Sequence, residues 1–415
     1  MSELTYLEKL LDGVKVEWQT LGKVLKRTKG TKITAGQMKA LHKDNAPLKI
    51  FAGGKTVAFV DFKDIPEKDI NREPSIIVKS RGIIEFEYYD KPFSHKNEMW
   101  SYHSNNDAIS IKYIYYFLKI NEGYFQKIGG KMQMPQIATP DTDKFEVPIP
   151  CPDNPEKSLA IQSEIVRILD KFTALTAELT AELNMRKKQY NYYRDQLLSF
   201  DEEQEKPVYL EKLLDGVKVE WKTLEKVLKR TKGTKITAGQ MKDLHKDNAP
   251  LKIFAGGKTV AFVDFKDIPE KDINREPSII VKSRGIIEFE YYDKPFSHKN
   301  EMWSYHSNND AISIKYIYYF LKINEGYFQK IGGKMQMPQI ATPDTDKFEV
   351  PIPCPDNPEK SLAIQSEIVR ILDKFDTLTN SITEGLPREI ELRQKQYEYY
   401  RDLLFSFPKP ETVSN

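Results

Sequence analysis

Cysteine is scarce in this sequence, whose 415 residues include only Cys151 and Cys354. Both lie in the same local sequence, VPIPCPDNPEK, so one is a copy of the other. Two such copies form neither a disulfide framework nor a metal-binding spacing, and they fit a reducing compartment. The sequence therefore excludes a small disulfide-stabilised secreted protein and predicts a cytoplasmic one.

Long apolar runs are also missing. No stretch of about 18 apolar residues occurs, so we expect no membrane span. The first residues, MSELTYLEKLLDGVKVEW, are charged and lack the apolar core of a signal peptide. The formal net charge is only +2, so no global field indicates a nucleic-acid partner. Hydrophobic residues make up 40% of the chain, which is sufficient for two or three globular domains.

Motifs for catalysis and for cofactor binding are absent as well. AGGKT at 52–56 looks like the end of a phosphate-binding loop, but that motif needs Gly at the position that Lys49 occupies. The chain has no His-Glu-x-x-His, no Gly-x-Ser-x-Gly, no glycine-rich cofactor loop and no Asn/Asp-Pro-Pro-aromatic motif. We therefore expect a protein that binds and scaffolds, without catalytic residues, metal ligands or a cofactor of its own.

An internal repeat dominates what the sequence does contain. Residues 6–172 match residues 209–375 at a constant offset of 203, with no gap. Three positions differ: Gln19 against Lys222, Gly22 against Glu225, and Ala40 against Asp243. Two such large copies are too few for a solenoid. They indicate a tandem duplication of one globular domain followed by a long helix.

Each globular copy, at about 15–155 and 218–358, mixes strand-like with helix-like patterns. KIFAG, TVAFVDF, SIIVKS and GIIEFEYY are typical of strands, whereas ISIKYIYYFLKINEGYF is typical of a helix. Connectors rich in Gly, Pro and Asn separate these runs. The pattern predicts the α+β fold class for both copies.

A long amphipathic helix follows each domain. Pro155 and Glu156 are expected to open the first one, with Ser158 near its cap, and the pattern continues to about Phe200. Apolar residues follow a 4-3-4-3-4 heptad seam in both copies: Ile161, Ile165, Ile168, Phe172, Leu175 and Leu179, then Ile364, Ile368, Ile371, Phe375, Leu378 and Ile382. A helix of roughly 66 Å is too long for one domain to cover.

We therefore predict that the two helices pair antiparallel, which relates the domains by a pseudo-two-fold axis and places them at opposite ends of a rod. An alternative, in which each helix packs only on its own domain, stays open.

A local basic strip lies within each domain. Residues 22–55 carry nine Lys and Arg against one acid, Asp44, which is typical of phosphate contact. Two loop-like stretches, SHKNEMWSYHSNND and GGKMQMPQ, add side chains suited to reading base edges. The candidate DNA-binding residues are Lys29, Lys32, Gln37, Lys39, Gly54, Lys55, His95, Lys96, Lys131, Gln133 and Gln136, with Lys232, Lys235, Gln240, Lys242, Gly257, Lys258, His298, Lys299, Lys334, Gln336 and Gln339 in the second copy. The alternative is a solvated lysine-rich face.

Taken together, these residues resemble a known family. FEVPIPCPDNPEKSLAIQSEIVRILDKF, the doubled TAEL in TALTAELTAEL at 173–183, and KKQYNYYRDQLLSF with its counterpart RQKQYEYYRDLLFSF are similar to specificity subunits of type I restriction–modification enzymes, in their EcoR124-type branch. The resemblance implies a target recognition domain at 1–155, a spacer helix at 156–200, a second recognition domain at 201–358, a second spacer helix at 359–407 and a tail at 408–415. The near identity of the two domains departs from the family pattern.

The resemblance also implies partners. Each domain would read one half of a split site in double-stranded DNA, and the helices would hold two methyltransferase subunits that methylate adenine. Those subunits would bring S-adenosylmethionine, and motor–nuclease subunits would bring ATP and Mg²⁺; no membrane is involved. Two other classes remain open: a stand-alone regulator that binds palindromic DNA, and a coiled-coil adaptor that binds proteins.

The doubled TAEL suggests a ruler. One TAEL adds about 6 Å of helix and about 400° of rotation, so the seam stays roughly in place. Helical turns inserted here should change the spacing between half-sites and leave the half-sites themselves unchanged. Four extra residues also precede Tyr397 near Glu384–Arg388, where Gly385 and Pro387 are able to interrupt the second helix. The alternative is a replication slip that merely inserted a good helix former.

Overall fold

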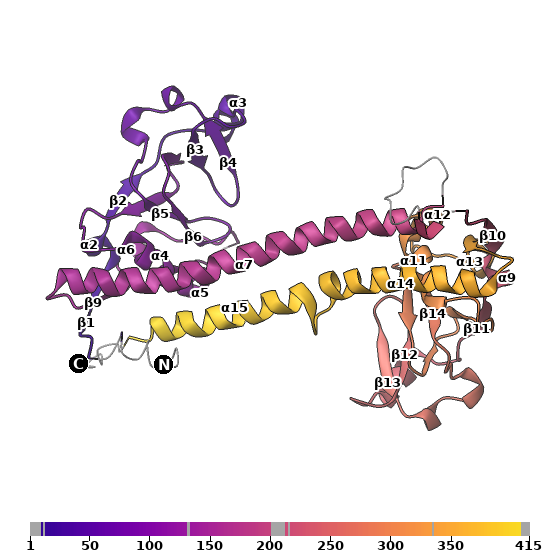
Figure 1. Ribbon diagram of the computed structural model, residues 1–415. Helices are drawn as coiled ribbons and strands as arrows, with labels where there is room; N and C mark the ends of the chain where they lie inside the picture. The colour runs from indigo at the N-terminus through magenta and orange to yellow at the C-terminus, as the bar shows by residue number, and fades with distance from the viewer. Residues whose placement is uncertain are drawn as a thin grey trace. The chain divides into compact units, whose positions relative to one another are not determined.

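The computed structural model describes residues 10, 13–130, 133–200, 212–214, 216–333 and 336–407. These residues divide into two compact units. Unit 1 comprises the described residues up to Leu179 together with those from Ile390 onward, and unit 2 comprises those within Thr180–Glu389. Each unit therefore combines one α+β domain with helical segments from two distant parts of the chain (Figure 1).

The domain of unit 1 alternates short strands and helices, as its sequence predicts. In chain order the elements are β1 (Val16–Thr20), α2 (Leu21–Val24), β2 (Lys26–Lys29), α3 (Ala35–Leu41), β3 (Leu48–Phe51), β4 (Val57–Val60), η1 (Phe62–Asp64), η2 (Glu67–Asp69), β5 (Ser75–Lys79), β6 (Glu85–Tyr89), β7 (Phe93–His95), β8 (Trp100–His103), α4 (Ile111–Ile120), α5 (Glu122–Gly129), α6 (Thr139–Asp143) and β9 (Glu146–Pro150).

Three small sheets form this domain. An antiparallel four-stranded sheet has the order β2-β8-β5-β6, and a three-stranded sheet has the order β4-β3-β7 with β3 and β7 parallel. β1 and β9 pair antiparallel where the domain begins and ends. Helix α4 packs on β5 and β6, and its buried Tyr113 donates a hydrogen bond to the Pro148 carbonyl oxygen at 2.9 Å.

The domain of unit 2 repeats this fold, which confirms the predicted α+β class. Its elements are β10 (Val219–Thr223), α9 (Leu224–Val227), β11 (Lys229–Lys232), α10 (Ala238–Leu244), β12 (Leu251–Phe254), β13 (Val260–Val263), η3 (Phe265–Asp267), η4 (Glu270–Asp272), β14 (Ser278–Lys282), β15 (Glu288–Tyr292), β16 (Phe296–His298), β17 (Trp303–His306), α11 (Ile314–Ile323), α12 (Glu325–Gly332), α13 (Thr342–Asp346) and β18 (Glu349–Pro353).

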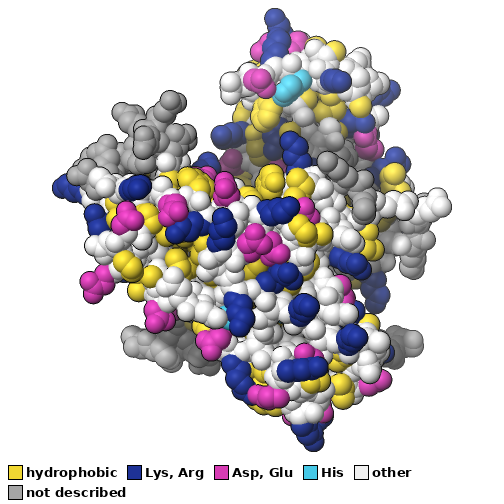
Figure 2. Space-filling model, turned by 90° about the vertical axis from the view of Figure 1, so that its right-hand side faces the viewer, with side chains coloured by type: hydrophobic (Ala, Val, Ile, Leu, Met, Phe, Trp, Pro, Cys, Tyr) yellow, Lys and Arg dark blue, Asp and Glu magenta, His cyan; other side chains and the backbone are white. Residues whose placement is uncertain are grey.

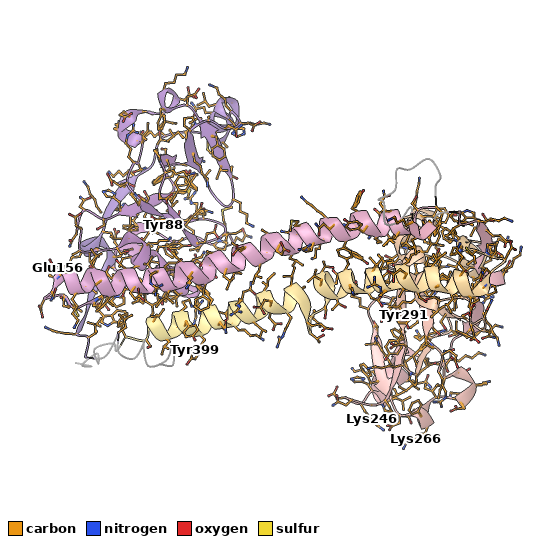
Figure 3. All side chains as sticks on the ribbon, viewed as in Figure 1. Tyr88, Glu156, Lys246, Lys266, Tyr291 and Tyr399 are labelled. Carbon is orange, nitrogen blue, oxygen red and sulfur yellow. The ribbon has the colours of Figure 1, made fainter. Side chains whose placement is uncertain are left out.

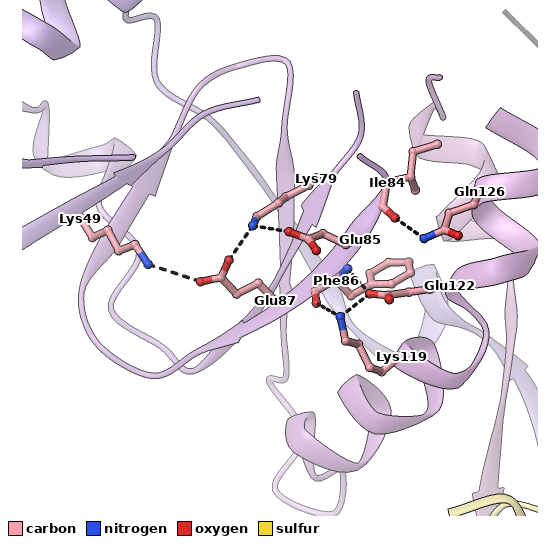
Figure 4. Close-up of polar contacts among 9 residues, drawn as sticks. All are labelled: Lys49, Lys79, Ile84, Glu85, Phe86, Glu87, Lys119, Glu122 and Gln126. Atoms are coloured by element: carbon pink, nitrogen blue, oxygen red, sulfur yellow. Dashed lines mark hydrogen bonds and ion pairs between the residues drawn. The ribbon is translucent and has the colours of Figure 1, made fainter. Parts of the chain in front are cut away.

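The outer edge of β6 is closed by side chains from the following helices. The Phe86 backbone N–H donates to Glu122 Oε1 at 2.7 Å, and Gln126 Nε2 donates to the Ile84 carbonyl oxygen at 3.2 Å (Figure 4). Glu85 and Glu87 of β6 lie 2.5 Å and 2.8 Å from the ammonium of Lys79, which belongs to the neighbouring strand β5. An edge strand that is satisfied and charged in this way resists pairing with another chain.

Helix α7 (Pro155–Leu198) is a single helix of 44 residues. It is held on the first domain by polar anchors: Gln162 accepts the Ser110 N–H at 2.9 Å, and Asp170 lies 2.7 Å from the Lys112 ammonium. Gln365 and Asp373 repeat these contacts in unit 2, with Ser313 and Lys315. Tyr88 and Tyr291, whose rings lie 5.3 Å from these lysines, mark the two equivalent junctions in Figure 3.

The second long helix is interrupted near Gly385 and Pro387, the two residues at which the sequence allows a break. It consists of α14 (Pro358–Asn380) and α15 (Gly385–Leu404), separated by the residues 381–384. Gly385 and Pro387 lie in the first turn of α15. Backbone N–H groups in the first turn of a helix have no helical acceptor, so the missing N–H of Pro387 removes no helical hydrogen bond. Ile382, expected to lie in the seam, is 80% exposed because it belongs to the break.

Both units contain a pair of helix segments that meet through aromatic rings. In unit 1 the Phe172 ring of α7 stacks on Tyr400 of α15, with centroids 5.4 Å apart. In unit 2 the Phe375 ring of α14 stacks on Tyr193 of α7 at 5.7 Å. Within unit 1 the first half of α7 thus meets the end of α15, and within unit 2 the end of α7 meets the end of α14.

The helix ends also complete the domain cores. Leu404, Phe405 and Phe407 are buried in the unit 1 core, where the Phe405 ring lies 5.3 Å from that of Tyr113. Leu197 and Leu198 are buried at the equivalent place in unit 2. The sequence pattern missed Leu169 and Leu372, which are fully buried next to the seam. The alternative in which each helix packs only on its own domain is therefore excluded within both units.

Replacing Leu169 with alanine should lower the free energy of unfolding of unit 1 by about 2–5 kcal/mol, because it leaves a cavity in a closed core. Leu372→Ala should do the same in unit 2. Leu175→Ala, at a partly exposed seam position of the same helix, is the control and should cost clearly less. Hydrogen exchange during urea unfolding measures each unit separately, and equal losses for Leu169→Ala and Leu175→Ala would contradict this assignment of the core.

Candidate nucleic-acid interface

Five loops of the first domain are joined by hydrogen bonds into one surface. Thr31 N donates to the His95 carbonyl oxygen at 2.7 Å, and Lys96 N donates to that of Phe51 at 2.9 Å. Ser80 Oγ reaches the Glu98 carbonyl oxygen at 2.6 Å. The Gly82 N–H donates to the Pro135 carbonyl oxygen at 2.9 Å. We call the residues 29–32, 52–56, 80–83, 96–99 and 133–136 the loop surface.

The loop surface is basic. It contains five Lys or Arg residues and one acid, Glu98, which pairs with Lys96 at 2.7 Å. Lys29, Lys32, Lys55 and Arg81 are exposed, so four cations remain beyond that pair. On the face that Figure 2 shows, Lys and Arg are interspersed with Asp and Glu, which agrees with the small net charge.

Two glycines shape the backbone of the loop surface. A Cβ on Gly30 would lie 2.3 Å from the Lys96 carbonyl oxygen, so only glycine allows the segment after β2 to cross to β7. Gly54 has φ +67° in the turn between β3 and β4, and the exposed Lys55 follows it. These glycines position Lys29, Lys32 and Lys55.

The predicted glutamines are all exposed, but they differ in whether their side chains already make hydrogen bonds within the protein. Gln37 lies at the N-terminal end of α3, where its Oε1 accepts the Thr34 N–H at 2.9 Å as part of a capping box. Its oxygen is thus committed to the helix. Gln133 and Gln136 are exposed, with Gln136 bridged to Arg81 through the backbone, and Lys39 is exposed on α3.

His95 was wrongly chosen as a DNA contact. It is fully buried, and its ring nitrogens lie 3.1 Å from Ser101 Oγ and 3.2 Å from the Lys96 carbonyl oxygen. Burial lowers the pKa of His95 to about 4, so the ring is neutral at physiological pH. His298 repeats this arrangement, with its pKa also lowered to about 4 by burial. Arg81 and its copy Arg284 are exposed cations of the loop surface that were not among the predicted contacts. The glycine that follows each of them, typical of an exposed turn, was the signal in the sequence that could have indicated them.

The second domain carries the same surface at 232–235, 255–259, 283–286, 299–302 and 336–339. Lys232, Lys235, Lys258 and the cap residue Gln240 are exposed, as are Lys242, Gln336 and Gln339, and Lys299 pairs with Glu301 at 2.7 Å. Gly257 has φ +67°. The exposed Glu225 and Asp243 lie outside these ranges, so the two loop surfaces have the same charge. Lys131 and Lys334, predicted as contacts, lie outside the described residues.

Over the described ranges, no group of three or more His, Cys, Asp or Glu side chains is placed to hold a metal ion. No helix in that part of the chain is long and apolar enough to cross a bilayer. Lysines that lie outside the loop surface are often paired, as Lys246 is with Asp264 near the labelled tip of the second domain (Figure 3).

Comparison with known proteins identifies the family. The profile described as "Type I restriction modification DNA specificity domain" matches residues 15–186 and 218–392. The EcoR124I/EcoR124II specificity subunit of Escherichia coli is 41% identical, with the whole of both chains covered. This chain belongs to the type I specificity subunits.

Further relatives agree. The EcoprrI specificity subunit of Escherichia coli is 34% identical, with 92% of this chain and 93% of the relative covered. The crystal structure of a specificity subunit from M. genitalium matches 96% of this chain and 98% of its own, with a TM-score of 0.65 at 17% identity, which supports the fold. Specificity subunits recognise DNA within complexes that also contain modification and restriction subunits, and they have no catalytic activity of their own.

Changing Lys29 and Lys32 to glutamine, together with Lys232 and Lys235, should weaken DNA binding by this specificity subunit. Each lost phosphate contact should also reduce the slope of log affinity against log salt by about 0.9. Fluorescence anisotropy across a salt series measures both quantities.

The matched control is Lys15→Gln and Lys157→Gln together with their copies Lys218→Gln and Lys360→Gln, which removes four exposed lysines outside the loop surface. If this control changes the salt slope as much as the variant of Lys29, Lys32, Lys232 and Lys235 does, the loop surface is not the DNA-binding site.

Proposed function

We propose that this specificity subunit reads a bipartite, palindromic site in double-stranded DNA and scaffolds two adenine methyltransferase subunits. The observation that carries the proposal is the identity of the two loop surfaces, which match residue for residue in all five ranges. Two identical readers recognise the same half-site. In dimeric DNA-binding proteins, a two-fold relation between readers corresponds to a palindromic operator.

The helix contacts support a two-fold relation between the readers. Phe172 and Phe375 are equivalent residues of the two copies, and their partners Tyr400 and Tyr193 are equivalent residues of the two helix ends. Each contact is therefore the image of the other. If the two recognition domains are related in the same way as these equivalent contacts, by a pseudo-two-fold axis, the two half-sites would be read on opposite strands.

The same arrangement supports the proposed partners. Two equivalent domain-and-helix junctions, one in each unit, offer two equivalent places for a modification subunit. Those subunits would bring S-adenosylmethionine and methylate adenine in each half-site. Motor–nuclease subunits, which use ATP and Mg²⁺, would join the complex to cut unmodified DNA.

Methylome sequencing of a host that expresses the chain with its modification subunits should reveal an interrupted palindrome. We expect one short half-site, a gap of any sequence, and the inverted complement of that half-site, with adenine methylated in both. An asymmetric methylated motif would refute the proposal.

A gel shift separates the proposal from a stand-alone regulator. The regulator predicts tight binding by the purified chain alone at physiological salt, whereas the proposal predicts tight binding only with the modification subunits. A coiled-coil adaptor predicts no salt-dependent DNA affinity in either case.

Deleting Thr180–Leu183 should shorten the gap between the half-sites by about two base pairs, because one TAEL spans about 6 Å of helix. The half-sites themselves should not change. Thr180→Ala with Glu182→Ala is the control, because it alters the same repeat at constant length and should keep the gap. A deletion variant that methylates the original spacing would contradict a ruler role for α7.

A further inference from the structure

The two long helical paths are joined at two equivalent aromatic contacts. Phe172 of α7 stacks on Tyr400 of α15, with an interplanar angle of 26°, and Tyr193 of α7 stacks on Phe375 of α14 at 25°. Helices that run alongside each other must cover the same distance between two shared contacts. The lengths of the two paths between these contacts should therefore agree.

The residue counts of the two paths do not agree. Phe172 and Tyr193 are 21 positions apart in the unbroken helix α7, whereas Phe375 and Tyr400 are 25 positions apart. If both paths were helical throughout, the second would be longer by about 6 Å at 1.5 Å per residue. The excess of four positions equals the number of residues between Asn380 and Gly385.

The structure removes this excess by looping out one helical turn. In a continuous helix, the carbonyl oxygen of Thr377 would face Ser381, four residues later. Instead, a Cβ on Gly385 would lie only 2.3 Å from that oxygen. Gly385 therefore lies against the carbonyl oxygen that Ser381 would face in a continuous helix. The loop that carries the chain from α14 to this position is visible in Figure 1.

The looped residues satisfy one another rather than the helix. Ser381 Oγ accepts the backbone N–H groups of Thr383 and Glu384, at 3.3 and 3.2 Å. Ile382 is 80% exposed, although it lies four positions after Leu378 and so continues the apolar spacing of α14. Ile382 thus has the position of a seam residue but is exposed to solvent. This indicates that the segment Ser381–Glu384 is compatible with a helix as well as with the loop.

We propose that Ser381–Glu384 form a stored helical turn, which lets the second helical path match an α7 that carries a third TAEL. With one more TAEL, the residues equivalent to Phe172 and Tyr193 are 25 positions apart, the same number as between Phe375 and Tyr400. The looped turn then joins the helix, and Ile382 enters the seam. Pro387 leaves the Thr383 carbonyl without its helical partner, so the joined helix is kinked there.

Substitution of Gly385 tests this proposal, because it should shift the melting temperature in opposite directions in the present chain and in a chain with a third TAEL. In the present chain Gly385 has φ +79°, and a side chain there meets the Thr377 carbonyl oxygen, so Gly385→Ala should lower the melting temperature. In a chain with a third TAEL inserted after Leu183, Gly385 becomes an interior helix residue, and the same substitution should raise the melting temperature. Calorimetry of the full chain measures both shifts.

Gly36→Ala is the matched control. Gly36 lies in α3, where an added methyl group would come no closer than 4.0 Å to the Thr34 hydroxyl, so its substitution should shift both chains in the same direction. A decrease of equal size for Gly385→Ala in the two chains would overturn the proposal.

Hydrogen exchange provides a second measurement that does not depend on the substitution. The amides of Ser381–Glu384 should exchange at least about tenfold more slowly in the three-repeat chain, because they become helical. Unchanged exchange, or a three-repeat chain that fails to fold, would count against a stored turn. Neither the melting temperature nor the hydrogen exchange involves DNA. A negative result in these measurements would therefore contradict the stored turn and leave the proposed function untouched.

Discussion

The structure depends on the pairing of α7 with α15 in unit 1 and with α14 in unit 2. This pairing does more than cover a helix seam, because each helix end is also part of a domain core. Leu197 and Leu198 complete the core of unit 2, and Leu404, Phe405 and Phe407 complete the core of unit 1. Neither recognition domain has its full apolar core until a helix segment from a distant part of the chain has docked on it.

Because the helix ends are exchanged in this way, the two copies of the duplicated domain share the helix α7. Two copies joined by flexible segments would behave as independent domains. Here α7 contributes Phe172 to unit 1 and Tyr193 to unit 2, so one continuous helix belongs to both. Its polar anchors, Gln162 and Asp170, recur as Gln365 and Asp373 with the same partners. The orientation of each loop surface relative to the helix is therefore fixed by identical contacts.

Much of the fold could be predicted from the sequence, because periodicity and repetition are local signals. The duplication, the α+β domains, the long helix from Pro155 and its antiparallel partner all follow from spacing. The fully buried Leu169 and Leu372 could not be predicted, because a heptad seam describes burial against a helix and omits burial against a domain. The position of the helix break was predicted only roughly, since Gly385 and Pro387 mark its far side and lie inside α15.

The candidate site shows a different limit. A count of basic residues found the strip and most of the loop surface, because charge is visible in the sequence. It did not distinguish Lys55, which is exposed, from Lys96, which is paired with Glu98, or from the buried His95. Burial and pairing depend on how β3, β7 and the following turns lie side by side, and this depends on contacts between residues far apart in the sequence.

A ruler built from two paired helices has a mechanical requirement that a single helix does not have. Lengthening α7 alone would shift one of the two aromatic contacts out of register by a whole turn. The helix ends that complete both cores would then have to withdraw, at a cost in buried apolar area. A spare turn in the opposite path avoids this conflict for one added turn. The spare turn does not compensate for a shortened α7, because residues that are already helical in α14 or α15 would then have to leave their helix. The length of such a ruler should therefore change more easily in one direction than in the other.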